Sequence, residues 1–580
     1  MSLKRARCAV LVACLSAVAI AQSPDRLQDP AAVHVDRLCV KFAEGSAAEL
    51  VGGHLRSGAG CDFTSVERHL AGASLEPLVT AVPRRQLDAW HAHACDVLPE
   101  GRRPGHLGLW FRVRARDAAT AAAIAERLDA EPLVEHMHYE PKLALASAAS
   151  AAPQDLPPTT PLFTSLQHTF EPTPTGHGIW QSQGIYGARG AGVGFYQLEG
   201  TYILDHEDVS QLVAANFLGV PSPDDPAGKH GTAGAGILCA DRNQYGITGA
   251  ADEATARFLC VDLNGGLENS MALALAASQP GDVLMMVVMT LMPSLGPGSW
   301  IPIEFFQSVF DASLTVTANG RSLVATPGNG NMSLDDPMFL GRFDRSYRDS
   351  GAVFVGATAG ALLQRASYCN WGSRVDVNGW GDQVATTSYG TIFFPNNDLR
   401  QAYTASYAGT SASTPHIAAV LLMLQGAAQK QLGRRLTNAE LMDALHTFGP
   451  GTPDVIGRRF DVAAAMAHFG IADGLSLQSP DVPAGGTITA QLDGPFGSIL
   501  ALFGSLVAAD IPIGWNRNLH LDPLTLTSVG AWVLTGSPAT YTLPVPASTS
   551  LYGVDLFFQA VRLQGSAPLE FTNSVQVTVL

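Results

Sequence analysis

Between about residues 180 and 470, short apolar runs alternate with longer helical segments. Near-continuous apolar runs of five to eight residues are typical of parallel strands that are buried on both faces. Strands that alternate with helices build a parallel sheet covered by helices on both sides. This alternation predicts a doubly wound, mainly parallel α/β domain over residues 179–472. The predicted strands are GVGFYQLE, ARFLCVDL, GDVLMMVVMT, RSLVATPG and GAVFVGAT, and the predicted helices are SMALALAASQ, PIEFFQSVFDASLTVTANG, SASTPHIAAVLLMLQGAAQ and NAELMDALHTF.

Different patterns flank this domain on each side. Residues 30–145 combine the strands VDRLCVKF, HLGLWFRVRARD and VEHMHYEPKL with an Ala-rich helix, which predicts a small α+β unit. Residues 146–178 are rich in Pro, Ser and Ala and predict a linker, with a short structured piece at LFTSLQHTF. Residues 473–580 hold only short alternating runs between turn residues, which predicts an all-β sandwich domain.

Composition narrows the range of partners. The chain has 580 residues, 47% of them hydrophobic and 15% charged, so it can bury several large cores. Its formal net charge of −16 argues against nucleic acid or an anionic membrane as a partner. No run beyond the N-terminus reaches about 18 clean apolar residues, so we expect no membrane span.

The first residues have the layout of a Sec-type signal peptide. The basic stretch MSLKRAR precedes the apolar stretch CAVLVACLSAVAIA, and Ala19-Ile20-Ala21 is a typical cleavage site. We therefore assign residues 1–21 as a signal peptide and expect a secreted protein. A lipoprotein anchor at Cys14 is the alternative, but the apolar stretch continues past that residue.

Cysteine usage does not describe a disulfide framework. Two cysteines lie in the signal peptide, and each of two later regions holds an odd number. Buried free thiols are the expected state, with at most one bridge per region. The three cysteines of the first region are Cys39, Cys61 and Cys95, and those of the second are Cys239, Cys260 and Cys369.

A turn of small residues, GTSASTPH, leads directly into the apolar segment IAAVLLMLQ at Gly409–His416. A helix N-terminus offers free backbone N–H groups and the positive end of the helix dipole. An attacking hydroxyl oxygen and a developing oxyanion would both be stabilised there. The simpler interpretation is that Ser411 or Ser413 caps the helix.

Two further segments carry residue types that serve catalysis. His230 opens the small-residue helix KHGTAGAGILCA, although a single histidine is more often structural. Asn329 follows a β-branched strand in SLVATPGNGN, at the carboxyl end where open α/β sheets bind ligands. An ordinary turn residue is the alternative role for this asparagine.

Taken together, these segments resemble the subtilisin-like serine peptidases, the subtilases, over about residues 180–470. The serine motif of that family, G-T-S-x-A/S-x-P-H, matches GTSASTPH, and its H-G-T and A-G-N-x-G motifs match HGT and, except at the first position, PGNG. The resemblance implies a subtilisin-like fold. It also implies that Ser411 is the nucleophile, His230 the general base and Asn329 the oxyanion-hole side chain.

The acid of the implied triad departs from the family pattern. Laid without gaps from Gly190, the family motif that ends in D-T-G places its catalytic Asp at Glu199, and H-P-D-L meets His206 and Asp208. A slip of two residues would instead place Gln197 there, on the same face of the strand. The ungapped fit favours Glu199, which retains the negative charge that stabilises an imidazolium.

The resemblance implies a secreted serine endopeptidase that hydrolyses peptide bonds in proteins through an acyl-enzyme. The α+β unit resembles a propeptide, which would act as an intramolecular inhibitor until the linker is cut. Protein or peptide substrates are the expected partners, and no cofactor is required. Structural calcium is common in the family, but the acidic pairs Asp224-Asp225 and Asp335-Asp336 are typical of solvated loops, so we assign no metal.

Two other hypotheses are compatible with the sequence. The irregular acid position allows a catalytically impaired scaffold that binds peptides or partners. Alternatively, the C-terminal sandwich is the functional unit and the α/β domain is its carrier.

Overall fold

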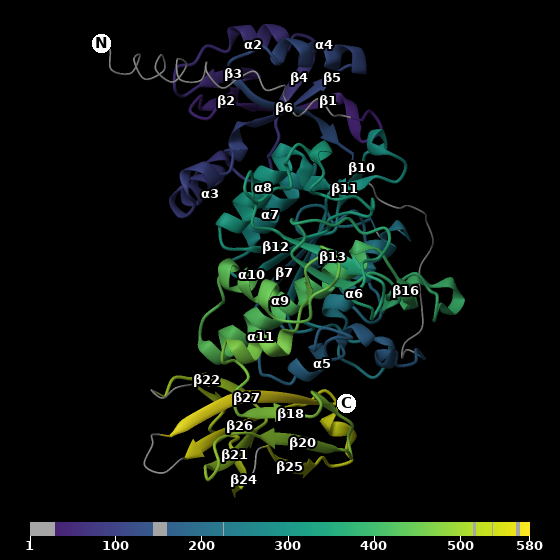
Figure 1. Cartoon of the computed structure of the whole chain (residues 1–580), viewed down its shortest axis with the longest axis vertical. Coiled ribbons are helices and arrows are strands. Elements are labelled where there is room, and N and C mark those ends of the chain that lie inside the picture. The colour runs from purple at the N-terminus through teal and green to yellow at the C-terminus, as the bar shows by residue number, and fades with distance from the viewer. Residues whose placement is uncertain (1–28, 143–158, 224–225, 514–517, 536–537, 564–568) are drawn as a thin grey trace.

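A computed structural model describes residues 29–142, 159–223, 226–513, 518–535, 538–563 and 569–580. Three tiers follow one another along the long axis: the N-terminal unit, an α/β unit, and a β-rich C-terminal unit (Figure 1). The predicted signal peptide, residues 1–21, and most of the first half of the predicted linker lie outside the described residues.

The N-terminal unit is a four-stranded antiparallel sheet with α2 (Thr64–His69) and α4 (Ala118–Leu128) on one face and α3 (Arg84–Val97) on the side of the α/β unit. In β1 and β5, alternate residues such as Leu38, Val40 and Phe111 pack under α4, while Cys39 and Trp110 face the α/β unit. The predicted strands and helix are present as β1, β5, β6 and α4. The sheet order is β4 (Ala73–Pro77), β5 (Trp110–Ala115), β1 (Val33–Phe42) and β6 (Val134–Pro141), with the hairpin β2 (Ala48–Val51) and β3 (His54–Ser57), and helices α2 (Thr64–His69), α3 (Arg84–Val97) and α4 (Ala118–Leu128).

The middle tier contains a seven-stranded parallel sheet with helices on both faces, which confirms the predicted α/β sheet. Alternate residues of β9 (Val283–Met286) face opposite layers. Val283 and Met285 face α9 (Thr410–Leu432), and Leu284 and Met286 face α7 (Leu267–Ala277) and α8 (Gln307–Ala318). The strand order is β17 (Arg458–Arg459), β14 (Val377–Trp380), β13 (Val353–Thr358), β12 (Ser322–Ala325), β9 (Val283–Met286), β7 (Gly194–Glu199) and β8 (Thr255–Cys260).

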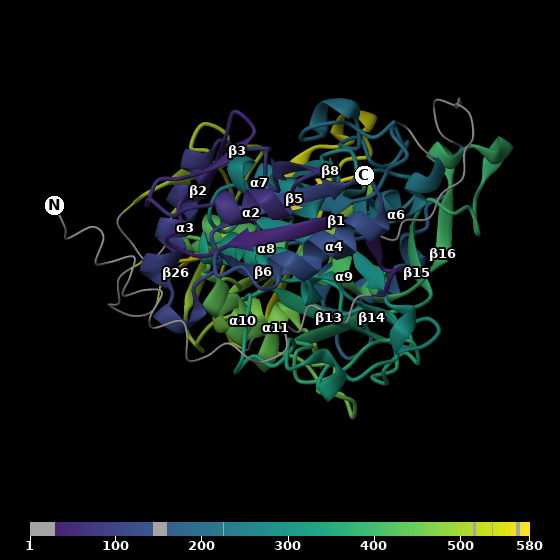
Figure 2. The ribbon, with the colours of Figure 1, turned by 90° about the horizontal axis from the view of Figure 1, so that it is seen from above.

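The helices of this tier and two small sheets complete the unit, and β15 (Val384–Thr387) and β16 (Tyr403–Tyr407) stand out at one side of the molecule in the view from above (Figure 2). The predicted strand GDVLMMVVMT divides into β9 and a separate strand, β10. The helices are α5 (Ile179–Ser182), α6 (Lys229–Cys239), α7 (Leu267–Ala277), α8 (Gln307–Ala318), α9 (Thr410–Leu432), α10 (Asn438–Thr447) and α11 (Val462–His468), and the two small sheets pair β10 (Met289–Leu291) with β11 (Trp300–Pro302), and β15 (Val384–Thr387) with β16 (Tyr403–Tyr407).

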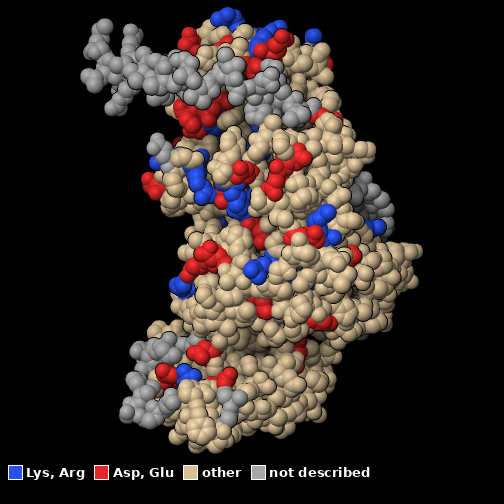
Figure 3. Space-filling model, viewed as in Figure 1, with Lys and Arg blue, Asp and Glu red and all other residues tan. Residues whose placement is uncertain are grey.

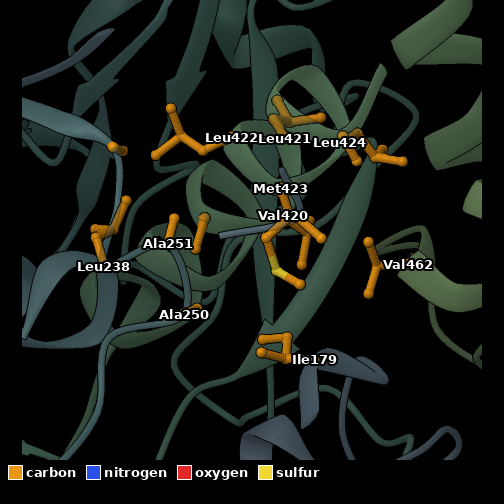
Figure 4. Packing of buried hydrophobic residues seen from close by; sticks show 14 of the residues in the cluster. Ile179, Leu238, Ala250, Ala251, Val420, Leu421, Leu422, Met423, Leu424 and Val462 are labelled. Carbon is orange, nitrogen blue, oxygen red and sulfur yellow. The ribbon is translucent and has the colours of Figure 1, made fainter. Parts of the chain in front are cut away.

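Helix α9 is the centre of the core. Its side chains are buried on almost every side, as expected of a helix that is apolar all round. Residues 420–424 lie among Ile179, Leu238, Ala250 and Val462, which come from other elements of the tier (Figure 4). This packing holds the first turn of α9 in a fixed position relative to the sheet.

The second half of the predicted linker is packed, and the structured piece predicted at LFTSLQHTF is present as two short 3-10 helices, Thr164–Leu166 and His168–Phe170. From residue 159 onward the chain packs on the α/β unit instead of spanning free space. Phe163 donates its backbone N–H to Gly246 at 2.6 Å, and Phe170 is 1% exposed. The buried guanidinium of Arg459 donates to the Thr175 carbonyl. These contacts come from residues far away in the chain, which the local Pro-rich composition does not reveal.

The C-terminal unit consists of a three-stranded and a five-stranded sheet that share a buried apolar cluster. Strand β27 also packs on the α/β unit, where Tyr186 donates its N–H to the Ser574 carbonyl at 3.0 Å. The three-stranded order is β18 (Leu475–Leu477), β20 (Thr487–Leu492) and β25 (Ala539–Pro544), the five-stranded order is β19 (Asp481–Val482), β27 (Glu570–Val579), β26 (Asp555–Leu563), β21 (Ile499–Ser505) and β24 (Thr527–Val533), and β22 (Ala508–Ile511) pairs with β23 (Leu519–Leu521).

The surface carries both signs of charge without a single dominant patch on the face shown in Figure 3. Charged side chains gather on the upper two tiers there, and the C-terminal tier is mostly uncharged. Within the described ranges, none of the helices combines the length and apolar character that crossing a bilayer requires. The six cysteines of those ranges are all free, in agreement with the expected thiols.

Candidate active site

Three elements of the α/β unit bring the candidate residues to one edge of the sheet. Glu199 is the last residue of β7, His230 is the second residue of α6, and Ser411 is the second residue of α9. Carboxyl ends of parallel strands and the N-termini of the following helices meet at this edge in open α/β sheets. Residues far apart in the chain therefore lie together.

Glu199 and His230 are in direct contact. Glu199 is 3% exposed, and its Oε2 lies 2.7 Å from His230 Nδ1. The other carboxylate oxygen accepts the N–H of Gly200 at 3.0 Å. Gln197 is fully buried, and its Nε2 donates to the Gly231 carbonyl at 2.8 Å. Of the two residues considered for the acid, the structure places Glu199 against the imidazole.

The pair sets the charge state of the histidine. Burial favours the neutral imidazole, but the charge of Glu199 and its hydrogen bond outweigh that effect and raise the pKa of His230 above its ordinary value. The ring of Tyr407 stands edge-on to the His230 ring at 5.8 Å between centroids. A carboxylate on Nδ1 fixes the tautomer, so Nε2 is the nitrogen that can accept a proton from a nucleophile.

Ser411 lies in the first turn of a 23-residue helix. The residue that precedes the helix is Gly409, whose φ of 96° is a conformation that favours glycine, and no side chain caps this end. Ser413 Oγ donates back to the Thr410 carbonyl at 3.0 Å. Neither serine is the cap, and Ser411 is left among the free N–H groups of the helix start.

The hydroxyl of Ser411 makes no hydrogen bond to the His230 ring within the described part of the chain. Contacts of this kind are often long in structures without substrate and shorten when the substrate binds. Ser411 is 5% exposed, so only a small part of the residue is accessible.

The Asn329 side chain is held in one orientation beside the same helix start. Its Oδ1 accepts the N–H of Thr410 at 3.0 Å and the hydroxyl of Thr410 at 2.9 Å. The Nδ2 group therefore points away from Thr410 and contacts the sulfur of Met289 at 3.8 Å. The positive φ angles of this turn belong to Gly328 and Asn331, so Asn329 is not needed as a left-handed turn residue.

Asn370 supports this turn and was missed by the sequence reasoning. Its Nδ2 donates to the carbonyls of Trp300 and Pro327, both at 2.7 Å, and its Oδ1 accepts the N–H groups of Gly330 at 3.0 Å and Met332 at 2.9 Å. Asn370 is the asparagine of N-W-G in YCNWGSRVDV, and this short pattern is the feature of the sequence that could have pointed to it. Asn370 thus holds both sides of the turn that presents Asn329.

Metal-binding side chains do not gather in this region. Across the residues that the structure describes, no three His, Cys, Asp or Glu side chains lie together as metal ligands would. Asp224-Asp225 lies outside those residues, and Asp335 accepts the N–H and hydroxyl of Ser373. We assign no metal site.

Comparison with known proteins gives the family. The profile of the "Subtilase family" matches residues 197–455. Subtilisin BL of Lederbergia lenta is 30% identical over 244 residues, which cover 41% of this chain and 78% of that protein. The chain belongs to the subtilase family. The match to the M-protease of Shouchella clausii is 28% identical over 266 residues, and this subtilase spans 61% of that protein's length.

Solved structures resemble this subtilase at lower identity. The epidermin leader peptide processing serine protease (EpiP) of Staphylococcus aureus is 14% identical, with a TM-score of 0.43 over 74% of this chain and 97% of that one. The family profile and the curated relatives, which include Subtilisin Savinase of Lederbergia lenta, support a subtilisin-like serine endopeptidase.

Proposed function

We propose that the protein is a serine endopeptidase that hydrolyses peptide bonds in proteins through an acyl-enzyme on Ser411. The observation that carries this proposal is the 2.7 Å contact between Glu199 and His230 at the edge of the sheet where α9 presents Ser411. A base that is oriented by a carboxylate, next to a hydroxyl nucleophile, is the arrangement that activates serine.

Each residue has a defined step. His230 Nε2 takes the hydroxyl proton of Ser411 while Oγ attacks the peptide carbonyl carbon, and Glu199 stabilises the imidazolium that forms. Asn329 Nδ2 and the Ser411 N–H hold the oxyanion, and each such donor contributes about 3 kcal/mol. The C–N bond then breaks as His230 protonates the leaving amine. Water attacks the acyl-enzyme by the same steps and releases the acid.

Labelling with a fluorophosphonate tests the proposal. We expect the mature protein to react at Ser411, to hydrolyse an unfolded protein substrate, and to lose both properties in Ser411→Ala. Ser413→Ala is the matched control, because that hydroxyl bonds to the helix backbone and is expected to leave labelling intact. Absence of labelling at Ser411 in folded mature protein would refute the proposal.

The alternative of a binding scaffold has no support from the comparisons, whose curated relatives carry protease names. That alternative was based on the departure from aspartate at the acid position. The position holds Glu199, a buried glutamate in contact with His230, and a glutamate retains the negative charge that the chemistry requires.

For the N-terminal unit we propose the role of a propeptide that inhibits in cis. It packs against α7 and α8. Asn269 Oδ1, in the first turn of α7, accepts the N–H of Thr80 at 2.7 Å. Asp311 Oδ2 of α8 accepts the Nε1–H of the buried Trp110 at 3.0 Å. At its end, the carbonyl of Lys142 accepts the hydroxyl of Thr290 at 3.3 Å. Thr290 follows Met289 in β10, so the unit ends beside the candidate oxyanion donor.

Processing tests this role. We expect active protein to begin within residues 143–178, and Ser411→Ala precursor to stay uncut when purified alone. Full-length protein that is active without cleavage would contradict an inhibitory role. Mass spectrometry of the active species provides both readouts.

We propose that the protein is secreted through the signal peptide at residues 1–21. The relative named "Extracellular protease" from Xanthomonas campestris is 27% identical over 239 residues and supports this location. Expression in a bacterial host tests it: we expect processed protein beyond the inner membrane, and retention in the cytoplasm once residues 1–21 are deleted.

A further inference from the structure

A methionine sulfur lies against the candidate oxyanion donor. Met289 Sδ is 3.8 Å from Asn329 Nδ2, and Met289 opens strand β10, which borders the site. A thioether is a weak hydrogen-bond acceptor. In the resting site it can satisfy one amide hydrogen without competing with a substrate oxyanion.

The amide of Asn329 has no alternative orientation available. Both donors of Thr410, its N–H and its hydroxyl, meet Oδ1. Rotating the amide by half a turn would place its NH₂ group against the backbone N–H of Thr410, which can only donate. Whatever accepts from Nδ2 therefore acts directly on the group that would stabilise the transition state.

Met289 differs from most other methionines in its accessibility. It is half-buried, whereas six others are at most 1% exposed. Oxidants reach exposed thioethers first. The six buried methionines are Met271, Met285, Met286, Met292, Met423 and Met466.

Building on the proposed peptidase function, we propose that Met289 is an oxidation site that switches the enzyme off by capturing the oxyanion donor. Hydrogen peroxide oxidises the thioether by two electrons: the O–O bond breaks, one oxygen becomes bonded to sulfur, and the other leaves as water. The sulfoxide oxygen is a strong acceptor, and because the sulfur lies only 3.8 Å from Asn329 Nδ2, this oxygen comes within hydrogen-bond reach of the amide. That bond holds the amide away from the oxyanion.

The experiment compares hydrolysis before and after hydrogen peroxide treatment of the mature protein. We expect kcat to fall at least about 10-fold, toward the 10²–10³-fold loss that follows removal of one oxyanion donor. KM is expected to change little, since the donor acts chiefly in the transition state. Methionine sulfoxide reductases A and B together are expected to restore the rate, and peptide mass spectrometry to locate the oxygen on Met289.

Four variants isolate the site, each measured against its own untreated rate. Met289→Leu is expected to resist peroxide. Met332→Leu and Met338→Leu remove another half-buried thioether and an exposed one, and both are expected to stay sensitive. Asn329→Ala tests the link itself. Its low residual rate is expected to be unaffected by peroxide, because the donor that the sulfoxide would capture is already gone.

The outcomes separate this inference from the function on which it rests. Sulfoxide at Met289 with unchanged kcat, equal losses in Met289→Leu and wild type, or a further loss in Asn329→Ala would each overturn the switch and leave the peptidase intact. If untreated protein neither hydrolyses substrate nor labels at Ser411, the proposed function fails first, and the switch fails with it.

Discussion

At the scale of single residues, the acid of the triad is the feature that sets this chain apart. Glu199 reaches His230 with one methylene more than an aspartate, and that extra length needs room. A Cβ placed on Gly231 would lie 2.5 Å from the Thr201 carbonyl oxygen and 2.9 Å from Glu199 Cγ. Only glycine therefore fits at the position next to His230.

Removing the charge of Glu199 is expected to stop most of the catalysis. In Glu199→Gln the imidazolium loses its stabilising partner, and we expect kcat/KM to fall by about 10⁴. Gln197→Ala leaves the pair intact, so its kcat/KM is expected to change little even though the buried cavity lowers its melting temperature. Kinetics and thermal melts of both variants check this. The reverse ranking of activity would show that Gln197 is the acid position.

Shortening the acid is expected to be harmful even though the family norm is aspartate. In Glu199→Asp the carboxylate withdraws from His230 Nδ1 by about one bond length, and misplacement of that size costs up to about 10² in rate. We expect kcat to fall while the protein stays folded. An unchanged kcat would mean that β7 shifts to restore the contact, which a structure of the variant would reveal.

The charge of Glu199 also sets the pH dependence. The general base must be neutral, so activity appears as pH rises through the pKa of His230. Burial lowers that pKa, but Glu199 raises it further, so we expect the acid limb of kcat/KM to lie above the ordinary histidine value of about 6.5. In Glu199→Gln the residual activity is expected to have its acid limb at lower pH. A limb that does not move would argue against the pair.

At this scale, the site residues that lie in short motifs could be predicted from the sequence. Ser411, His230 and Asn329 each belong to such a motif, in which a local turn or a helix start restricts the residue types. Gln197 and Glu199 share one face of β7, so the pattern favoured Glu199 without excluding Gln197. The distance to His230 decides between them, and that distance depends on how α6 packs across the sheet.

At the scale of elements, the strands and helices of the α/β unit could be predicted from local hydrophobic patterns, whereas the residues that hold the site in place could not. Asn370 and Met289 contact residues far away in the chain, and no hydrophobic periodicity marks their positions. The segment from residue 159 to 178 shows the same limit. Its composition predicts a linker with a short structured piece that includes Phe170, but it does not reveal that Arg459 donates to the carbonyls of Pro174 and Thr175 and so holds this segment on the α/β unit.

Asn370 is expected to matter more for rate than its distance from the chemistry implies. In Asn370→Ala four backbone groups of the turn lose their partner, and we expect kcat to fall about 10² as Asn329 shifts. Asn378→Ala is the matched control. Asn378 is equally buried on β14 and bonds to Gly457 and Arg459, so its loss is expected to lower stability by about 1–3 kcal/mol with kcat preserved. Equal kcat in the two variants would refute the supporting role of Asn370.

At the scale of the whole molecule, the C-terminal unit is joined to the α/β unit by a buried interface. The apolar core continues from α9 across β27 into the two C-terminal sheets. Gln431 of α9 donates to the Ser574 hydroxyl at 3.1 Å. Such continuity indicates that the two units stabilise each other, which the turn-rich sequence after residue 473 could not show. The hypothesis in which the α/β domain only carries a functional C-terminal sandwich does not require a buried interface between the two units.

Two of the ion pairs across that interface allow the coupling to be measured. Arg189 is 5% exposed and contacts Glu253 within its own tier. Across the interface it lies 3.7 Å from Asp555 Oδ1 and donates to the hydroxyl of Thr578 at 2.8 Å. Arg189→Met leaves the partly exposed carboxylates of Glu253 and Asp555 without this cation, so we expect a loss of about 1.5–3 kcal/mol in the free energy of unfolding. Lys430→Ala removes a partly exposed pair with Asp510 and is expected to cost less than about 1 kcal/mol. Urea denaturation of both variants decides the matter: a loss for Arg189→Met no larger than that for Lys430→Ala would show that the two units are stable independently.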